Sequence, residues 1–123
     1  METMTRMSTD CEHRLVDRAT VLDRVGGDED LLREITCIFL TEYPRLIDEI
    51  RSAVNTGDAM RLERAAHSLK GSVSNFGAPA ATEAAYRLES IGRKLQMTQA
   101  AEALEELVSQ FQQLRPELEE LCG

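Results

Sequence analysis

A histidine, a lysine and a glycine stand close together in the segment 67–78, which reads HSLKGSVSNFGA. At about 100° per residue, a helix through this segment gathers its apolar residues on one face and places His67 roughly 140° away from them. His67 is therefore expected on the solvent side, with Lys70 and Gly71 one turn further along, because residues three and four apart are neighbours on a helix. An unperturbed imidazole has a pKa of about 6.5, so a neutral, nucleophilic ring beside a cation suits chemistry on an anionic group.

Gly71 is unfavourable in the middle of a helix, by roughly 1 kcal/mol relative to alanine. Because it lies on the solvent side, it does not serve the core, and we interpret it as clearance beside the imidazole. A partner docking there would meet four polar residues of the same helix: Glu63, Arg64, Ser68 and Ser74. Two simpler interpretations remain open, namely an ordinary surface histidine, or a surface pair between His67 and Glu63 one turn earlier.

Charge is distributed unevenly along the chain. Residues 61–94 hold six basic and three acidic residues, a local charge of +3 in a chain of −8, which leaves −11 for the remainder. This pattern favours a local field suited to a phosphoryl group or an acidic partner, although ordinary surface scatter would also explain it. Binding of nucleic acid through its phosphates is not expected, because that requires a basic surface.

The elements that position these residues are all expected to be helices, since no stretch alternates like a strand for long. Helices are expected over about 17–25, 31–54, 59–76, 79–95 and from Thr98, as a cap, to 121. The 31–54 helix is expected to have Asp28 as its cap, with Glu29 and Asp30 in its first turn, the segment NTGD (55–58) ends it and caps the next, and Pro79 opens the fourth helix. Pro44 is expected to kink the second of them and Pro116 to bend or fray the last. The apolar stripe of the 31–54 helix is assigned to Leu31, Ile35, Ile38, Phe39, Tyr43, Leu46, Ile47, Ile50 and Val54, and that of the next-to-last helix ends at Leu95. Four long amphipathic helices with short loops predict an all-α, up-down antiparallel four-helix bundle over 15–123 with a short extra N-terminal helix, preceded by a flexible tail over 1–14.

The three cysteines, Cys11, Cys37 and Cys122, show no metal-ligand spacing. Cys37 is expected to be a small buried apolar residue, and no structural disulfide is expected, which predicts a reducing, cytoplasmic location. Neither a secretory signal nor a run of about 18 apolar residues is present, so no membrane association is expected. His13 in the tail has no evident role.

At this point the sequence resembles the histidine-containing phosphotransfer (HPt) domains of multistep two-component phosphorelays. The resemblance covers about 16–121 and rests on HSLKGSVSNFGA, with support from GDEDLLREITCIFL and RLESIGRKL. In this family His67 would be the phosphorylated histidine, with Nε2 as the acceptor, Lys70 the cation beside the phosphate and Gly71 the clearance glycine. Leu69 would be the core residue of the motif, and Gly77 would close its helix.

The resemblance implies a relay intermediate: His67 accepts a phosphoryl group from a receiver-domain aspartate and passes it to another receiver. The implied partners are receiver domains of response regulators and hybrid sensor histidine kinases, with Mg²⁺ on the receiver and no cofactor on this chain. Neither autokinase activity nor an ATP site is expected, because no phosphate-binding loop or hydrolase motif is present. A monomer is expected, since no spare apolar stripe is evident. The main alternative is a helical adaptor that binds receiver domains without phosphotransfer.

Overall fold

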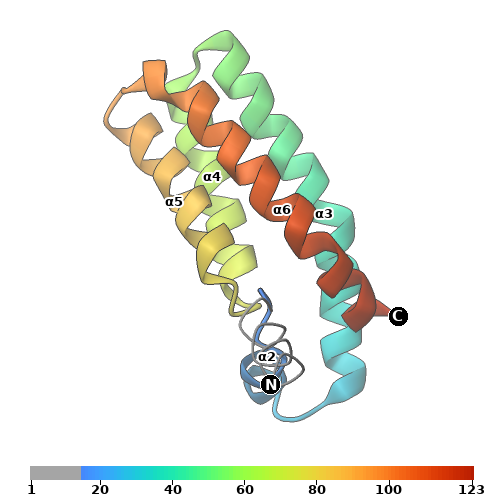
Figure 1. The fold of residues 1–123 in the computed structure, drawn as a ribbon. Helices are drawn as coiled ribbons and strands as arrows, with labels where there is room; N and C mark the ends of the chain where they lie inside the picture. Colours follow the sequence, from blue (N-terminus) through green and yellow to red (C-terminus); the bar gives the residue numbers. More distant parts are fainter. Residues whose placement is uncertain (1–14) are drawn as a thin grey trace, which may run out of the picture.

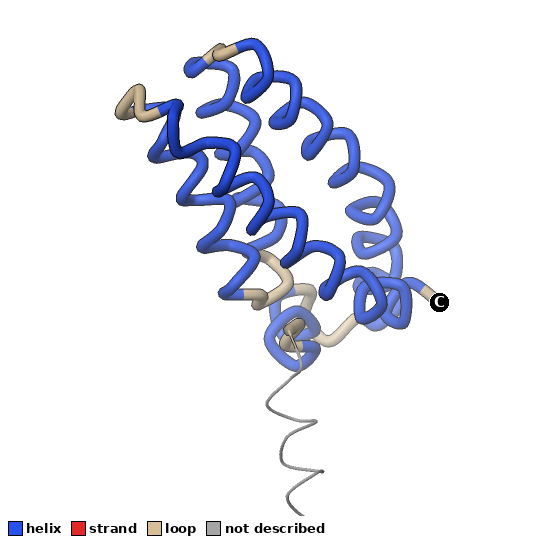
Figure 2. The backbone as a smooth tube through the Cα atoms, turned by 45° about the horizontal axis from the view of Figure 1, so that its top comes forward, coloured by secondary structure: helices blue, strands red, loops and turns tan. Residues whose placement is uncertain are grey.

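The computed structural model describes residues 15–123, and in this part of the chain the only regular elements are helices. A short helix α2 (Arg18–Arg24) is followed by the four long helices α3 (Glu29–Thr56), α4 (Ala59–Ser74), α5 (Pro79–Arg93) and α6 (Ala100–Cys122). Figure 1 shows the long helices side by side along one axis, in up-down order. The connections between them are short (Figure 2), so neighbours in sequence are antiparallel neighbours in space. The expected four-helix bundle with a short extra helix is confirmed.

Three aspartates begin helices. The side chains of Asp17, Asp28 and Asp58 accept hydrogen bonds from backbone N–H groups in the first turns of α2, α3 and α4. Each satisfies a donor that has no partner within its helix. Pro79 begins α5, where its missing N–H costs nothing. These local signals agree with the helix starts expected from the sequence.

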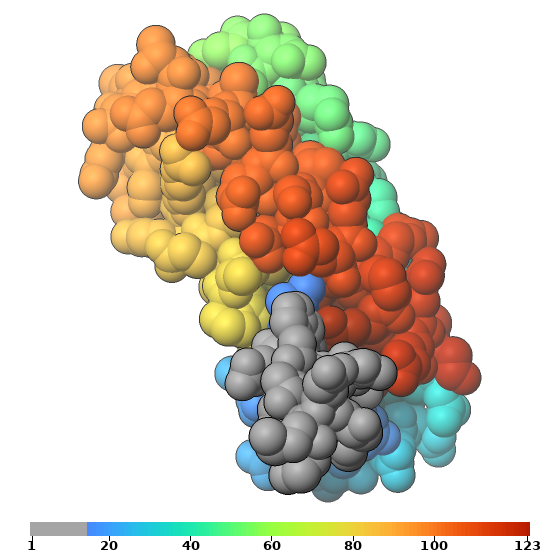
Figure 3. Space-filling model, in the orientation of Figure 1, coloured from blue at the N-terminus to red at the C-terminus, as the bar shows by residue number. Residues whose placement is uncertain are grey.

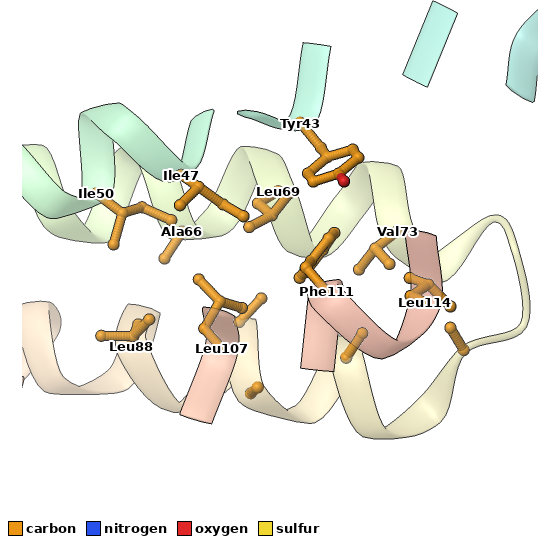
Figure 4. Packing of buried hydrophobic residues seen from close by; sticks show 14 of the residues in the cluster. Tyr43, Ile47, Ile50, Ala66, Leu69, Val73, Leu88, Leu107, Phe111 and Leu114 are labelled. Atoms are coloured by element: carbon orange, nitrogen blue, oxygen red, sulfur yellow. The ribbon is translucent and has the colours of Figure 1, made fainter. Parts of the chain in front are cut away.

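The core lies along the bundle axis and receives side chains from all four long helices. Figure 4 shows Ile50 and Tyr43 of α3, Leu69 of α4 and Leu107 of α6 turned toward one another. The rings of Tyr43 and Phe111 pack in a tilted arrangement with centroids 5.0 Å apart. In Figure 3, α6 crosses the face between α5 and α3, and it packs on both. One continuous core therefore fixes the rotation of α4 and decides which of its residues face solvent.

Helix α2 closes one end of the bundle, against the loop between α4 and α5. The backbone N–H of Asp17 donates to the carbonyl of Phe76 at 3.2 Å, and Arg24 donates to the carbonyl of Ser74 at 3.1 Å. Gly77 has φ +59°, and a Cβ there would lie 2.9 Å from Cβ of Asp17. The sharp turn after α4 therefore needs a glycine for its backbone angle and for the close approach of α2.

Some core assignments from the sequence were wrong. Leu31 and Ile38 are exposed, and Leu32 and Thr36 are buried in their place. The error arose because a helix rich in apolar residues has several registers with similar apolar stripes. Thr36 can be buried because its hydroxyl donates a hydrogen bond to the carbonyl of Leu32. Leu95 is also exposed: α5 ends at Arg93, and Leu95 turns the chain with φ +57°.

The start and the end of the last helix also differ from expectation. Residues Met97–Gln99 form a 3₁₀ turn and α6 begins at Ala100, so Thr98 does not cap it. Pro116 lies inside α6, which continues to Cys122 without fraying. Pro44 lies inside α3, which is a single helix across it, as expected. Helix α4 ends at Ser74, two residues before the expected Phe76. The C-terminal end of α6 is tied to α3 by a covalent bond.

That tie is a disulfide, so the expectation of no structural disulfide was wrong. Cys37 of α3, only partly buried, is bonded to Cys122 of α6, with a Cα–Cα distance of 5.0 Å. The two cysteines lie 85 residues apart, and only the antiparallel arrangement of α3 and α6 brings them together. The tail expected over 1–14, with Cys11 and His13, lies outside the described residues. Within residues 15–123, every helix is too short or too polar to span a bilayer.

Candidate functional site

The imidazole of His67 projects from the middle of α4 on the side away from the core. Its side chain is 67% exposed, while Ala66 and Leu69 on the same helix are fully buried. Gly71, one turn further along, is exposed, and a Cβ built on it would meet no atom within 4 Å. The ring and the open space beside it therefore lie as the helical spacing predicted.

Beneath the ring lies a buried acid that is not among the site residues expected from the sequence. Nδ1 of His67 is 2.9 Å from Oε2 of Glu89 on α5, and the Glu89 side chain is only 4% exposed. An ionised carboxylate can only accept hydrogen bonds, so Nδ1 carries the proton and donates it. In the neutral ring the lone pair is then on Nε2, for which residues 15–123 offer no hydrogen-bond partner.

Two cations also hold the Glu89 carboxylate. The ammonium of Lys70 is 2.7 Å from Oε1. Within residues 15–123, no other donor reaches this oxygen. The guanidinium of Arg93 donates to Oε2 at 2.9 Å, and its Nε donates to Glu63 at 3.2 Å. The Lys70 ammonium also lies 5.2 Å from the centre of the Tyr86 ring. A buried carboxylate is stable when it is paired in this way.

These contacts decide the protonation state of Glu89. Burial raises the pKa of the carboxyl group, but hydrogen bonds from Lys70 and His67, together with their charges, outweigh it and leave the pKa below its ordinary value. Glu89 is therefore ionised at neutral pH. A fixed negative charge beneath the ring stabilises positive charge on the imidazole.

The close approach of α5 to α4 makes the contact with His67 possible. A Cβ on Gly92 would lie 2.7 Å from the carbonyl oxygen of Ala59 and 2.8 Å from the backbone nitrogen of Glu63. The two helices are therefore in backbone contact at that turn, as only a glycine permits. Glu89, one turn earlier on α5, reaches under the middle of α4.

The residues expected at a docking surface are separated into two groups. Glu63 pairs with Arg93 rather than with His67, and Ser74 donates to the carbonyl of Gly71 at 2.9 Å. Arg64 and Ser68 are exposed and line an open groove of about 460 Å³ between α4 and α3. Of the four residues expected at a docking surface, Arg64 and Ser68 are therefore the two that line this groove.

The sequence contains one signal that would have found Glu89. It stands four residues after Ala85 and three before Gly92, on the face of α5 that packs into the bundle. An acid on a face of small and apolar residues is buried and needs a positively charged partner. The basic residues of the facing helix are candidates for that partner. Arg93, four residues after Glu89, belongs to the site through its contact with Glu89, and Tyr86 through its contact with Lys70.

The arrangement is suited to nucleophilic chemistry on an anionic group. It presents a ring nitrogen with a free lone pair, a carboxylate that balances charge on the ring, and a lysine beside it. In residues 15–123 no group of three or more His, Cys, Asp or Glu side chains is placed to hold a metal ion.

Comparisons with known proteins found one family and one solved structure that this chain resembles. The model of the Hpt domain family matches residues 34–121, which include His67, Lys70, Gly71, Glu89 and Arg93. The chain is also similar to a solved structure, histidine-containing phosphotransfer protein B (HptB) from Pseudomonas aeruginosa PAO1, with a TM-score of 0.80 and 24% identity over 86% of this chain and 92% of that one. At this identity the likeness bears on the fold. Among curated protein sequences no match was found.

Proposed function

Because this chain belongs to the Hpt domain family, whose members carry phosphoryl groups in relays and are not kinases, we propose that it accepts a phosphoryl group on Nε2 of His67 from a receiver-domain aspartate and passes it to another receiver. One observation carries the choice of atom. Nδ1 is occupied by Glu89 at 2.9 Å, while the ring is largely exposed. Nε2 is therefore the ring nitrogen with both a lone pair and access.

The transfer step needs no proton to move. The lone pair of Nε2 attacks phosphorus, the P–Nε2 bond forms, and the P–O bond of the aspartyl phosphate breaks. The receiver's carboxylate leaves with the electron pair. The imidazole ring becomes positively charged and keeps its Nδ1 proton, which still donates to Glu89. The buried carboxylate thus stabilises the charge that develops on the ring.

Lys70 and Gly71 serve the approach of the phosphoryl group in this proposal. The Lys70 side chain is 28% exposed, so its ammonium is able to turn from Glu89 toward an anion on Nε2. Gly71 leaves open the space through which the receiver's aspartate approaches. Positioning and charge neutralisation are the main sources of rate in phosphoryl transfer.

The proposed partners are receiver domains of response regulators and hybrid sensor histidine kinases, which would supply Mg²⁺ and bind over the His67 side of α4. Arg64 and Ser68 are the docking residues that the exposed groove favours. We further propose that the protein acts as a monomer in the cytoplasm and has no ATP site of its own. The cysteines no longer support this location, because Cys37 and Cys122 are bonded in the fold; in a reducing cytoplasm the pair would be held as two thiols.

The test is label transfer from receiver domains of the same organism, each phosphorylated on aspartate with radioactive phosphate by its own kinase. The parent protein and a His13→Gln variant should take up label that is acid-labile and base-stable, whereas His67→Gln should remain folded by circular dichroism and unlabelled. Label on His67→Gln would refute the assignment of the acceptor. Stable binding of receivers without any label on the parent would instead support the adaptor alternative.

A further inference from the structure

The Glu89 carboxylate has two permanent cations where one would balance its charge. Lys70 lies 2.7 Å from Oε1, and Arg93 lies 2.9 Å from Oε2. The two cations come from different helices. Lys70 stands one turn after His67 on α4, and Arg93 stands one turn after Glu89 on α5.

Arg93 is held in place independently of Lys70. Its Nε donates to Glu63 on α4 at 3.2 Å while its Nη2 donates to Glu89, so the guanidinium bridges α4 and α5. With a neutral His67, the two acids and the two bases of this cluster balance. A phosphoryl group on Nε2 would add up to about two negative charges. A cation is then needed beside the phosphate, and Lys70 is the one that is not bridged to a second acid.

We propose that Arg93 is a positioning residue of the transfer site: it keeps Glu89 seated and neutralised beneath His67 while Lys70 turns to the phosphoryl group. This inference rests on the proposed function. Every charge keeps a partner throughout, because Arg93 stays on Glu89, the charged imidazole ring shares the same carboxylate, and Lys70 faces the phosphate.

The physical reason is the burial of Glu89. A buried carboxylate that loses all of its counter-ions is strongly destabilising, whereas one that keeps a cation is not. Without Arg93, Lys70 would be the last permanent cation on Glu89, and it would be retained there instead of turning to the phosphate. The loss of Arg93 should therefore slow transfer without affecting how the receiver docks.

The first experiment needs no receiver. Thermal unfolding is measured for Lys70→Met, for Arg93→Gln and for the double variant. Each single variant should lose less than about 5 °C, while the double variant should lose at least about 5 °C more than their sum. Adding Glu89→Gln to the double variant should recover most of that excess, because the unpaired charge is then gone. Additive losses, or an excess that Glu89→Gln leaves in place, would overturn the proposal.

The second experiment measures single-turnover transfer from a labelled receiver at several receiver concentrations. Arg93→Gln should lower the maximal rate at least about tenfold and leave the half-saturating receiver concentration unchanged. Arg93→Lys restores the charge and should recover most of the rate. The matched control is Arg87→Gln, an exposed arginine of α5 with no ion pair within residues 15–123, and it should match the parent.

An unaltered maximal rate in Arg93→Gln, or a failure of Arg93→Lys to recover it, would overturn the proposal. A rise in the half-saturating concentration alone would make Arg93 a docking residue, which also contradicts it. If the parent itself takes no label from any receiver, the proposed function fails, and the unfolding experiment still decides whether the two cations share Glu89.

Discussion

Nδ1 of His67 and Oε2 of Glu89 lie 2.9 Å apart, although 22 residues separate them in the sequence. The contact joins a largely exposed ring to a carboxylate that is only 4% exposed. It sets which ring nitrogen carries the proton, and it places a negative charge where the ring becomes positive during transfer. The reactivity of His67 is therefore expected to depend on a residue of another helix.

Glu89→Gln is expected to slow phosphotransfer by about tenfold or more, because the amide has no charge to stabilise the charged ring. The amide NH₂ group is also able to donate to Nδ1, which would move the ring proton to Nε2 and block the nucleophilic atom. Rapid-quench transfer measures the rate, and nitrogen NMR of the imidazole reports which nitrogen is protonated. The control is Glu83→Gln, an exposed acid of α5. A parent-like rate and ring proton in Glu89→Gln would contradict the role.

Stability toward acid should also depend on Glu89. The pKa of its carboxyl group is lowered in the folded state, where burial is outweighed by Lys70 and His67. A lowered folded pKa contributes stability that is present above the unfolded pKa, about 4.3, and is lost as pH falls through the folded pKa. The parent should therefore lose this contribution below about pH 4, and Glu89→Gln should lose less over the same range. Urea unfolding between pH 7 and pH 3 measures the difference; parallel curves for the two proteins would contradict it.

The exposed half of the site could be predicted from the sequence because helical spacing fixes it. His67, Lys70 and Gly71 lie within five positions of one helix, and their angles to the core follow from local geometry alone. The position of Glu89 beneath His67 could not be predicted in this way. Its role depends on how α5 is rotated against α4, and that rotation is set by the contact at Gly92.

Errors in the fold have the same origin. The predicted apolar stripe of α3 is shifted by one residue at its start. Leu31 and Leu32 fit a helical period almost equally well, and only tertiary packing decides which of them is buried. The disulfide was missed because Cys37 and Cys122 stand 85 residues apart, and their pairing depends on the register of α3 and α6. Local signals that need no partner, such as the cap at Asp28 and the start of α5 at Pro79, were predicted correctly.

Lys70→Ala is expected to slow transfer by about tenfold, as the loss of one cation worth roughly 1.4 kcal/mol would. Lys70 lies off the core stripe, so the substitution removes no apolar packing. Its ion pair with the buried Glu89 now predicts a small loss, limited by Arg93. Rapid-quench kinetics and thermal unfolding measure the two effects. A parent-like rate would remove Lys70 from the mechanism.

The disulfide between Cys37 and Cys122 should stabilise the fold by about 2–4 kcal/mol, because it closes a long loop and so restricts the unfolded chain. Addition of a thiol reductant should lower the urea midpoint of the parent. Cys122→Ser should start at the lower midpoint and not respond to reductant, which serves as the control. A midpoint of the oxidised parent that is insensitive to reductant, or free thiols on both cysteines after exposure to oxidised glutathione, would show that the bond does not form.

Substitution by alanine should have opposite effects on stability at Gly71 and at Gly92, the two glycines inside long helices. A Cβ at Gly71 meets nothing within 4 Å, so Gly71→Ala should stabilise the fold by up to about 1 kcal/mol. A Cβ at Gly92 would lie 2.7 Å from a backbone oxygen, so Gly92→Ala should destabilise it by about 1–3 kcal/mol. Thermal unfolding of the two variants tests whether space, and not the residue type, decides the sign.

A larger side chain at Gly71 should separate stability from function. Gly71→Gln projects beside His67 and holds the receiver's aspartate away from Nε2, where about 1 Å of misplacement is enough to slow a reaction about 100-fold. The variant should therefore melt no lower than the parent and yet transfer phosphoryl groups poorly, a combination that a folding defect does not produce. Rapid-quench transfer beside thermal unfolding of the same samples measures both. If Gly71→Gln melted well below the parent, the glycine would serve the backbone; if it transferred at the parent's rate, the open space beside His67 would have no part in docking.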